Sequence, residues 1–210
     1  DLIHLKQKKF MYTYLALGDS YTIGEQVPLQ ENFPFQLVKK LQADGLEVAL
    51  PVIIAKTGWT TDELATAIRE ENIQETFSFV TLLIGVNNQY RGRDTENYSI
   101  EFKQLFHQAI GFANGCASRV FVVSIPDWGV TPFAEGKDRR KIAEEIDAYN
   151  FVNKTITLEN GAHWLDITES TRTNGTEADF LAEDGLHPSS KEYHIWAQQL
   201  SSQVFQVLKA

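Results

Sequence analysis

The sequence has 210 residues, and 28 acidic against 19 basic side chains give a formal net charge of −9. This length favours a single domain, and a hydrophobic content of 43% is typical of a folded globular chain. The acidic balance argues against a nucleic-acid-binding protein, which would present a basic surface. The single cysteine, Cys116, excludes an intrachain disulfide and a zinc site built from cysteines.

The termini and the hydropathy bear on location. No apolar run reaches the roughly 20 residues that a membrane-spanning helix needs, so we expect no stable membrane insertion. Residues 1–10 lack the apolar centre of a signal peptide and precede the only methionine, Met11. We interpret 1–10 as an N-terminal extension, for which both a native and a non-native origin stay open, and 11–210 as a single domain. A cytoplasmic location is expected, although a signal already removed would leave no trace.

Short β-rich runs alternate with longer helical patterns along the chain. Five strands are predicted, the first four apolar on both faces and the last weaker, at Tyr12–Leu17, Val48–Ala55, Phe79–Ile84, Arg119–Ser124 and Ala162–Asp166. Helices are predicted over Phe35–Ala43, Thr60–Arg69, Tyr98–Ala113, Arg139–Leu158 and Ser189–Leu208. Capping boxes are expected where Glu63 follows Thr60 and where Glu192 follows Ser189. The alternation predicts an α/β fold: a three-layer α/β/α sandwich with a central parallel, flavodoxin-like sheet of about five strands.

Functional residues of such sheets gather at the carboxyl ends of the strands. There the chain carries Gly18-Asp19-Ser20, Lys56-Thr57-Gly58-Trp59, Gly85-Val86-Asn87-Asn88 and Pro126-Asp127-Trp128-Gly129. A further segment, Asp184-Gly185-Leu186-His187-Pro188, precedes the last predicted helix. The glycine patterns of dinucleotide and P-loop sites are absent, as are G-x-S-x-G and H-E-x-x-H.

Taken singly, these residues have ordinary structural explanations. Ser20 can cap a helix, Gly58 can form a turn, and Asn87 can anchor a loop. Asp184 and His187 can be a loop carboxylate and a surface histidine. Their i, i+3 spacing also allows the carboxylate to hold one ring nitrogen and leave the other free as a base.

Taken together, in this order, the segments resemble the SGNH hydrolases, also called the GDSL esterase/lipase family. Gly18-Asp19-Ser20 is similar to the nucleophile block, Gly58 to the second block, Gly85-x-Asn87 to the third and Asp184-x-x-His187 to the last. The resemblance spans residues 14 to 196. Many members have Asp after the third-block asparagine, where this chain has Asn88.

The resemblance implies a serine esterase that hydrolyses small or short-chain esters or thioesters, with lysophospholipids and acetylated sugars among the compatible substrates. Ser20 would be the nucleophile, His187 the base and Asp184 the acid that orients it. The N–H groups of Ser20 and Gly58 and the Asn87 side chain would form the oxyanion hole. The scheme needs no metal and no cofactor, and its partner is a small-molecule ester.

Four aromatic residues near the strand ends are candidate walls of a substrate pocket: Trp59, Tyr90, Trp128 and Phe133. Such residues more often belong to the core. Two alternatives use the same fold. One is a flavodoxin-like module that binds a phosphate or flavin at the Ser20–Thr22 turn, and the other is an SGNH-fold binding protein without turnover. The sequence leaves the acyl and alcohol groups and the oligomeric state open.

Overall fold

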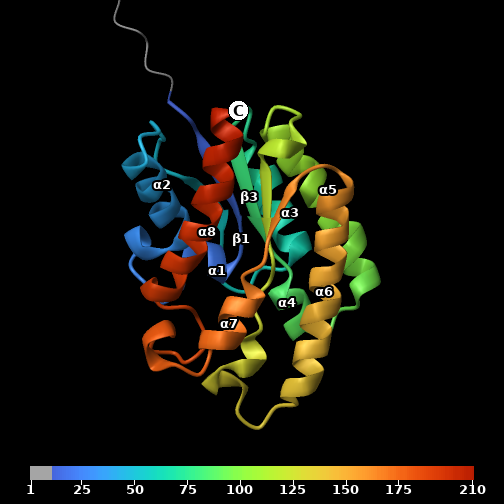
Figure 1. Ribbon diagram of the computed structural model, residues 1–210. Coiled ribbons are helices and arrows are strands. Elements are labelled where there is room, and N and C mark those ends of the chain that lie inside the picture. Colours follow the sequence, from blue (N-terminus) through green and yellow to red (C-terminus); the bar gives the residue numbers. More distant parts are fainter. Residues whose placement is uncertain (1–10) are drawn as a thin grey trace, which may run out of the picture.

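The computed structural model describes residues 11–210, so the expected extension at 1–10 lies outside the described residues. Its centre is a parallel sheet with the strand order β2-β1-β3-β4-β5 (Figure 1). The strands are β1 (Tyr14–Gly18), β2 (Val52–Ala55), β3 (Phe79–Leu83), β4 (Val120–Val123) and β5 (His163–Leu165). The predicted five-stranded parallel sheet is therefore confirmed.

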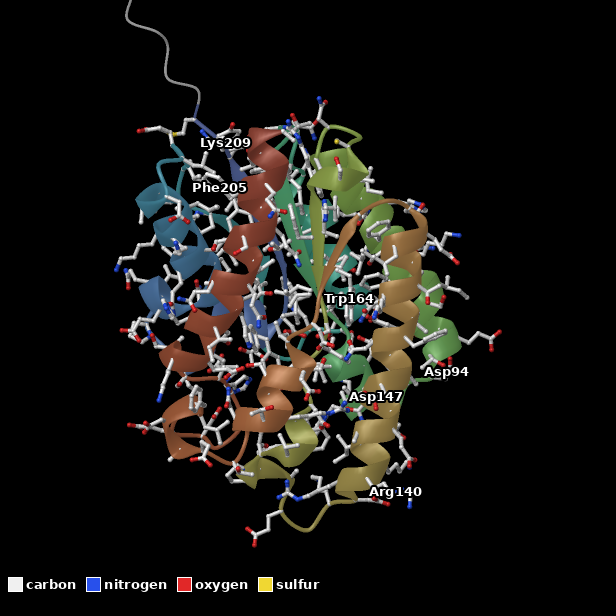
Figure 2. All side chains as sticks on the ribbon, in the orientation of Figure 1. Asp94, Arg140, Asp147, Trp164, Phe205 and Lys209 are labelled. Carbon is white, nitrogen blue, oxygen red and sulfur yellow. The ribbon has the colours of Figure 1, made fainter. Side chains whose placement is uncertain are left out.

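Helices cover both faces of this sheet, which completes the predicted three-layer sandwich (Figure 1). The helices α2 (Phe33–Ala43) and α8 (Ser190–Lys209) pack against each other on one side. On the other side lie α3 (Thr61–Glu71), α5 (Thr95–Phe112) and α6 (Arg139–Glu159). Figure 2 shows side chains filling the spaces between the layers, while charged ones such as Arg140 of α6 reach outward.

Short helices follow several strands and were not predicted. They are α1 (Ser20–Ile23), α4 (Val86–Tyr90) and α7 (Thr168–Asn174), with 3-10 turns at Leu29–Glu31, Ala117–Arg119, Trp128–Val130, Pro132–Ala134 and Ala178–Phe180. Each of α1, α4 and α7 is seven residues or shorter. That length is too short to produce the repeating apolar pattern by which longer helices are recognised.

Burial of the strands follows their position in the sheet. Every residue of β1, β3 and β4 is buried, as expected. The expectation was wrong for β2, because β2 is an edge strand with Val52 43% exposed. It also begins at Val52 rather than at Val48. Pro51 immediately precedes it, and proline has no N–H to donate to a ladder.

One of the two expected capping boxes forms. The Glu63 carboxylate accepts the Thr60 N–H at 2.9 Å. At the second site, Ser189 caps α8, but its own N–H already donates to the Phe180 carbonyl at 2.9 Å, which leaves Glu192 no cap donor. Glu192 is instead buried and accepts hydrogen bonds from Ser170, Asn174 and Trp196.

Candidate active site

Three residues predicted from the sequence meet at the carboxyl end of β1. The Ser20 Oγ lies 3.0 Å from Nε2 of His187, although the two residues are 167 positions apart. On the other side of the ring, Nδ1 of His187 lies 2.6 Å from Oδ2 of Asp184. Ser20 is 4% exposed and His187 7% exposed, so their hydrogen bond is shielded from bulk water. This arrangement can relay a proton from the hydroxyl to the imidazole.

The turn after β1 fixes the position of Ser20. A Cβ on Gly18 would stand 2.6 Å from the Leu83 carbonyl oxygen of the neighbouring strand, so only glycine fits there. Asp19 then acts as N-cap, because its Oδ1 accepts the Tyr21 N–H at 3.0 Å. As a result, α1 begins at Ser20 itself, and Asp19 rather than Ser20 has the capping role.

The loop before α8 fixes Asp184 and His187. Oδ1 of Asp184 accepts the N–H groups of Leu186 and His187, both at 3.0 Å, while Oδ2 faces the imidazole. Partial burial opposes ionisation of Asp184, but the hydrogen bonds from His187 and Leu186 outweigh it and hold its pKa below the usual value. The Tyr21 ring packs against His187, with ring centroids 5.1 Å apart. The imidazole is therefore held from two sides.

Gly58 and Asn87 lie beside Ser20 and line the same cavity. Gly58 has φ +86°, a left-handed conformation that favours glycine. The Asn87 amide donates to the Trp59 carbonyl at 3.0 Å, which fixes its orientation and leaves its second N–H for a ligand. Together with the Ser20 N–H, these groups have the chemical character that the oxyanion hole requires.

Two residues that sequence reasoning did not select tie the Gly58 and Asn87 loops together. Asn88 is fully buried; its oxygen accepts the Thr61 N–H at 3.1 Å and its amide donates to Thr61 Oγ1 at 2.7 Å. Arg91 donates to the Gly58 carbonyl at 2.6 Å. Asn88 thus uses both halves of its amide. The sequence contains no signal for either contact.

A cavity of about 180 Å³ opens in front of Ser20, and we call it the catalytic cavity. Three of the four predicted wall residues line it: Tyr90, Trp128 and Phe133. Their rings pack together, with centroids 5.3 Å apart for Tyr90 and Trp128 and 6.0 Å apart for Trp128 and Phe133. The structure packs the Trp59 side chain against the hydrophobic core instead. Tyr21, Val86 and Leu186 complete much of the apolar lining and were not predicted.

Asp19, which directly precedes Ser20, is a second carboxylate close to the nucleophile. It is fully buried, and its Oδ2 has no hydrogen-bond partner within residues 11–210. Burial raises its pKa to about 7, although the Tyr21 N–H lowers it in part. Asp19 does not contact His187 through any hydrogen bond of the described chain, so Asp184 is the carboxylate that faces the imidazole.

Membrane-spanning helices and metal clusters are both absent from residues 11–210. No helix of that range combines the length and the apolar character needed to cross a membrane. Within it, no group of three or more His, Cys, Asp and Glu side chains is arranged to hold a metal ion.

Comparison with known proteins identifies the family. The family model described as the GDSL-like Lipase/Acylhydrolase family matches residues 16–195, which is most of the chain. The spore germination lipase LipC of Bacillus licheniformis is 24% identical, over 89% of this chain and 93% of its own.

Solved structures show the same fold at low sequence identity. The acetylxylan esterase Axe2 of Geobacillus stearothermophilus is 20% identical with a TM-score of 0.72, and the match covers 92% of this chain and 94% of that one. A lipase/acylhydrolase of Enterococcus faecalis is 19% identical, also with a TM-score of 0.72, covering 92% and 95%. The fold, the ordered sequence blocks and the match to the family model agree. This chain belongs to the GDSL-like lipase/acylhydrolase family, and it is a carboxylic ester hydrolase.

Proposed function

We propose that the protein hydrolyses small carboxylic esters through an acyl-enzyme on Ser20, with His187 as general base and Asp184 as the residue that orients it. The observation that carries the proposal is the continuous contact from Asp184 through His187 to Ser20, at 2.6 and 3.0 Å. The 3.0 Å distance is within the range expected between a nucleophile and its base, and the 2.6 Å distance is within the range expected between the base and the group that orients it.

In the first half-reaction, Ser20 Oγ attacks the ester carbonyl while Nε2 of His187 takes the hydroxyl proton. Asp184 stays ionised and stabilises the imidazolium, which agrees with its lowered pKa. The carbonyl oxygen gains negative charge and is held by the Ser20 and Gly58 N–H groups and by the Asn87 amide. His187 then returns the proton to the departing alcohol.

In the second half-reaction, a water molecule takes the place of the alcohol beside His187. The imidazole removes a proton from that water, the acyl carbonyl is attacked, and the proton returns to Ser20 as the acid is released. Every proton transfer in this scheme involves Nε2 of His187. No other group of the described cavity is needed to move a proton.

The size of the catalytic cavity supports a small acyl group. Its volume of about 180 Å³ is below the roughly 300–1,000 Å³ of pockets for drug-sized ligands. We therefore propose short-chain acyl esters or thioesters, acetyl esters of sugars included, over lysophospholipids. The acetylxylan esterase among the structural neighbours is consistent with this choice. A phosphate- or flavin-binding module is less well supported, because His187 engages the Ser20 hydroxyl and α1 has only four residues.

The test is hydrolysis of p-nitrophenyl esters from acetyl to long-chain by the wild type, by Ser20→Ala and by Ser202→Ala. Ser202 is an exposed serine of α8 and serves as the matched control. We expect Ser20→Ala to lower kcat by about 10⁴-fold or more and Ser202→Ala to leave it unchanged. Substantial activity in Ser20→Ala would contradict the proposal, and so would a wild type that hydrolyses no ester, which would indicate a binding protein without turnover.

A further inference from the structure

A second, smaller cavity lies next to the catalytic cavity. It has a volume of about 20 Å³, which is room for roughly one water molecule. Three side chains line both cavities: Tyr21, Trp128 and Leu186. We call these three residues the dividing wall and the smaller space the rear cavity.

The rear cavity is suited to an apolar group. Its lining includes Pro126, Phe180, Leu181 and Pro188. The charged groups in its lining already have partners, so they do not require water or a polar ligand. Asp127 pairs with Arg172 at 2.9 Å and accepts the Gly129 N–H at 2.9 Å.

Glu192, the other acid of the rear cavity, accepts hydrogen bonds from Ser170 at 2.6 Å and from Asn174 and Trp196 at 2.9 Å each. An aliphatic chain entering the rear cavity would therefore leave no buried charge unpaired. Burial of this chain would then contribute the usual hydrophobic free energy per methylene group.

The order of the reaction indicates which part of the ester faces the dividing wall. The alcohol leaves first, and water must then reach the carbon beside His187. The alcohol side of the cavity must consequently stay open to solvent, so the closed side holds the acyl chain. Tyr21, Trp128 and Leu186 close off one side of the catalytic cavity, because they stand between it and the rear cavity.

The three residues of the dividing wall differ in the other contacts that their side chains make. Tyr21 packs on the ring of His187 and donates its N–H to Asp19. Trp128 donates from Nε1 to Gln89 at 2.7 Å and packs on two other aromatic rings. The Leu186 side chain is half-buried and has no such task, since only its backbone N–H bonds to Asp184.

We propose that Leu186 is the specificity-determining residue that closes the acyl side of the catalytic cavity and limits the enzyme to short acyl chains. This inference rests on the proposed function. Removal of the branched end of Leu186 joins the two cavities and admits a longer chain. Each further methylene that becomes buried raises kcat/KM by about fourfold.

The test compares kcat/KM for butyryl and octanoyl p-nitrophenyl esters in the wild type, Leu186→Ala, Leu186→Val and Leu181→Ala. Leu181 is the matched control, because it lines the rear cavity but not the catalytic cavity. We expect Leu186→Ala to raise the octanoyl-to-butyryl ratio by about tenfold or more, with Leu186→Val intermediate. Leu181→Ala alone should leave the ratio within about twofold, because the wall is intact.

An unchanged ratio in folded Leu186→Ala or Leu186→Val would overturn the inference, as would an equal rise in Leu181→Ala. A series of alkyl acetates checks the assignment of sides: a gain for long alcohols and none for long acyl groups would contradict it. Octanoate and butyrate binding, measured by calorimetry in the Ser20→Ala background with and without Leu186→Ala, requires no turnover. It is expected to show the same shift in relative affinity, and it separates failure of the wall from failure of the proposed function.

Discussion

Replacing Asp19 by Asn tests how the fold holds an acid directly beside the nucleophile. Asp19 is fully buried, with one oxygen bonded to the Tyr21 N–H at 3.0 Å and the other without a donor within residues 11–210. Asn keeps the shape and the accepting oxygen but cannot ionise. The substitution therefore removes the charge and keeps the helix cap.

The magnitude follows from the pKa of Asp19, which burial raises from 3.8 to about 7. At about 1.4 kcal/mol per pH unit, the difference corresponds to roughly 4 kcal/mol of folding free energy. Because the pKa is raised in the folded state, this stability is fully present below about pH 4 and is lost as the pH rises through about 7. The Asp19→Asn variant would show no such loss.

The assay is urea unfolding of the wild type and Asp19→Asn at several values between about pH 4 and pH 8. Taking the difference between the two proteins at each pH cancels the titration of the other carboxylates. We expect the unfolding free energy of the variant minus that of the wild type to rise by about 4 kcal/mol between about pH 4 and pH 8. A difference that does not change with pH would refute the reasoning, because it would mean that Asp19 ionises in the folded protein as it does in the unfolded one.

Three further substitutions test separate parts of the site and its support. Asn87→Ala removes one oxyanion donor and should lower kcat by about 10²–10³-fold with little change in KM; a change in KM alone would assign Asn87 to ground-state binding. Asp184→Asn should lower kcat by about 10³–10⁴-fold with the fold retained by circular dichroism, and a loss below about tenfold would contradict its orienting role. Arg172→Ala leaves the buried Asp127 carboxylate unpaired and should lower the unfolding free energy by about 3 kcal/mol. Adding Asp127→Asn should restore much of that stability. An Arg172→Ala variant with unchanged unfolding free energy would contradict a stabilising role for the Arg172–Asp127 pair.

The layers of the fold could be predicted because the three inner strands are almost entirely apolar on both of their faces, with Thr81 of β3 as a buried polar exception. This pattern is typical of a parallel sheet that helices cover on both faces. The edge strand β2 was less predictable, because its sequence is as apolar as that of the inner strands although Val52 is exposed. Glu192 shows a different limit. A capping box and a buried acceptor for distant donors have the same local sequence, and only the tertiary contacts decide between them.

The candidate site was predictable as a set of residues, not as a geometry. The resemblance of the ordered segments to the SGNH hydrolases indicated Ser20, Gly58, Asn87, Asp184 and His187. The spacing could not show that Ser20 Oγ and His187 Nε2, which are 167 positions apart in the chain, lie 3.0 Å from each other. The dividing wall was invisible for a related reason: Leu186 sits inside the Asp-x-x-His segment and resembles an ordinary spacer. The role that we propose for its side chain depends on its position in the lining of both cavities.

The most direct test of the central claim is to trap the nucleophile with a p-nitrophenyl alkylphosphonate and to locate the adduct by mass spectrometry. Wild-type protein is expected to release p-nitrophenolate in a stoichiometric burst and to carry the phosphonyl group on Ser20, while His187→Ala reacts far more slowly. A phosphonyl group on any other residue, or an unlabelled Ser20 in protein that still hydrolyses esters, would contradict the account.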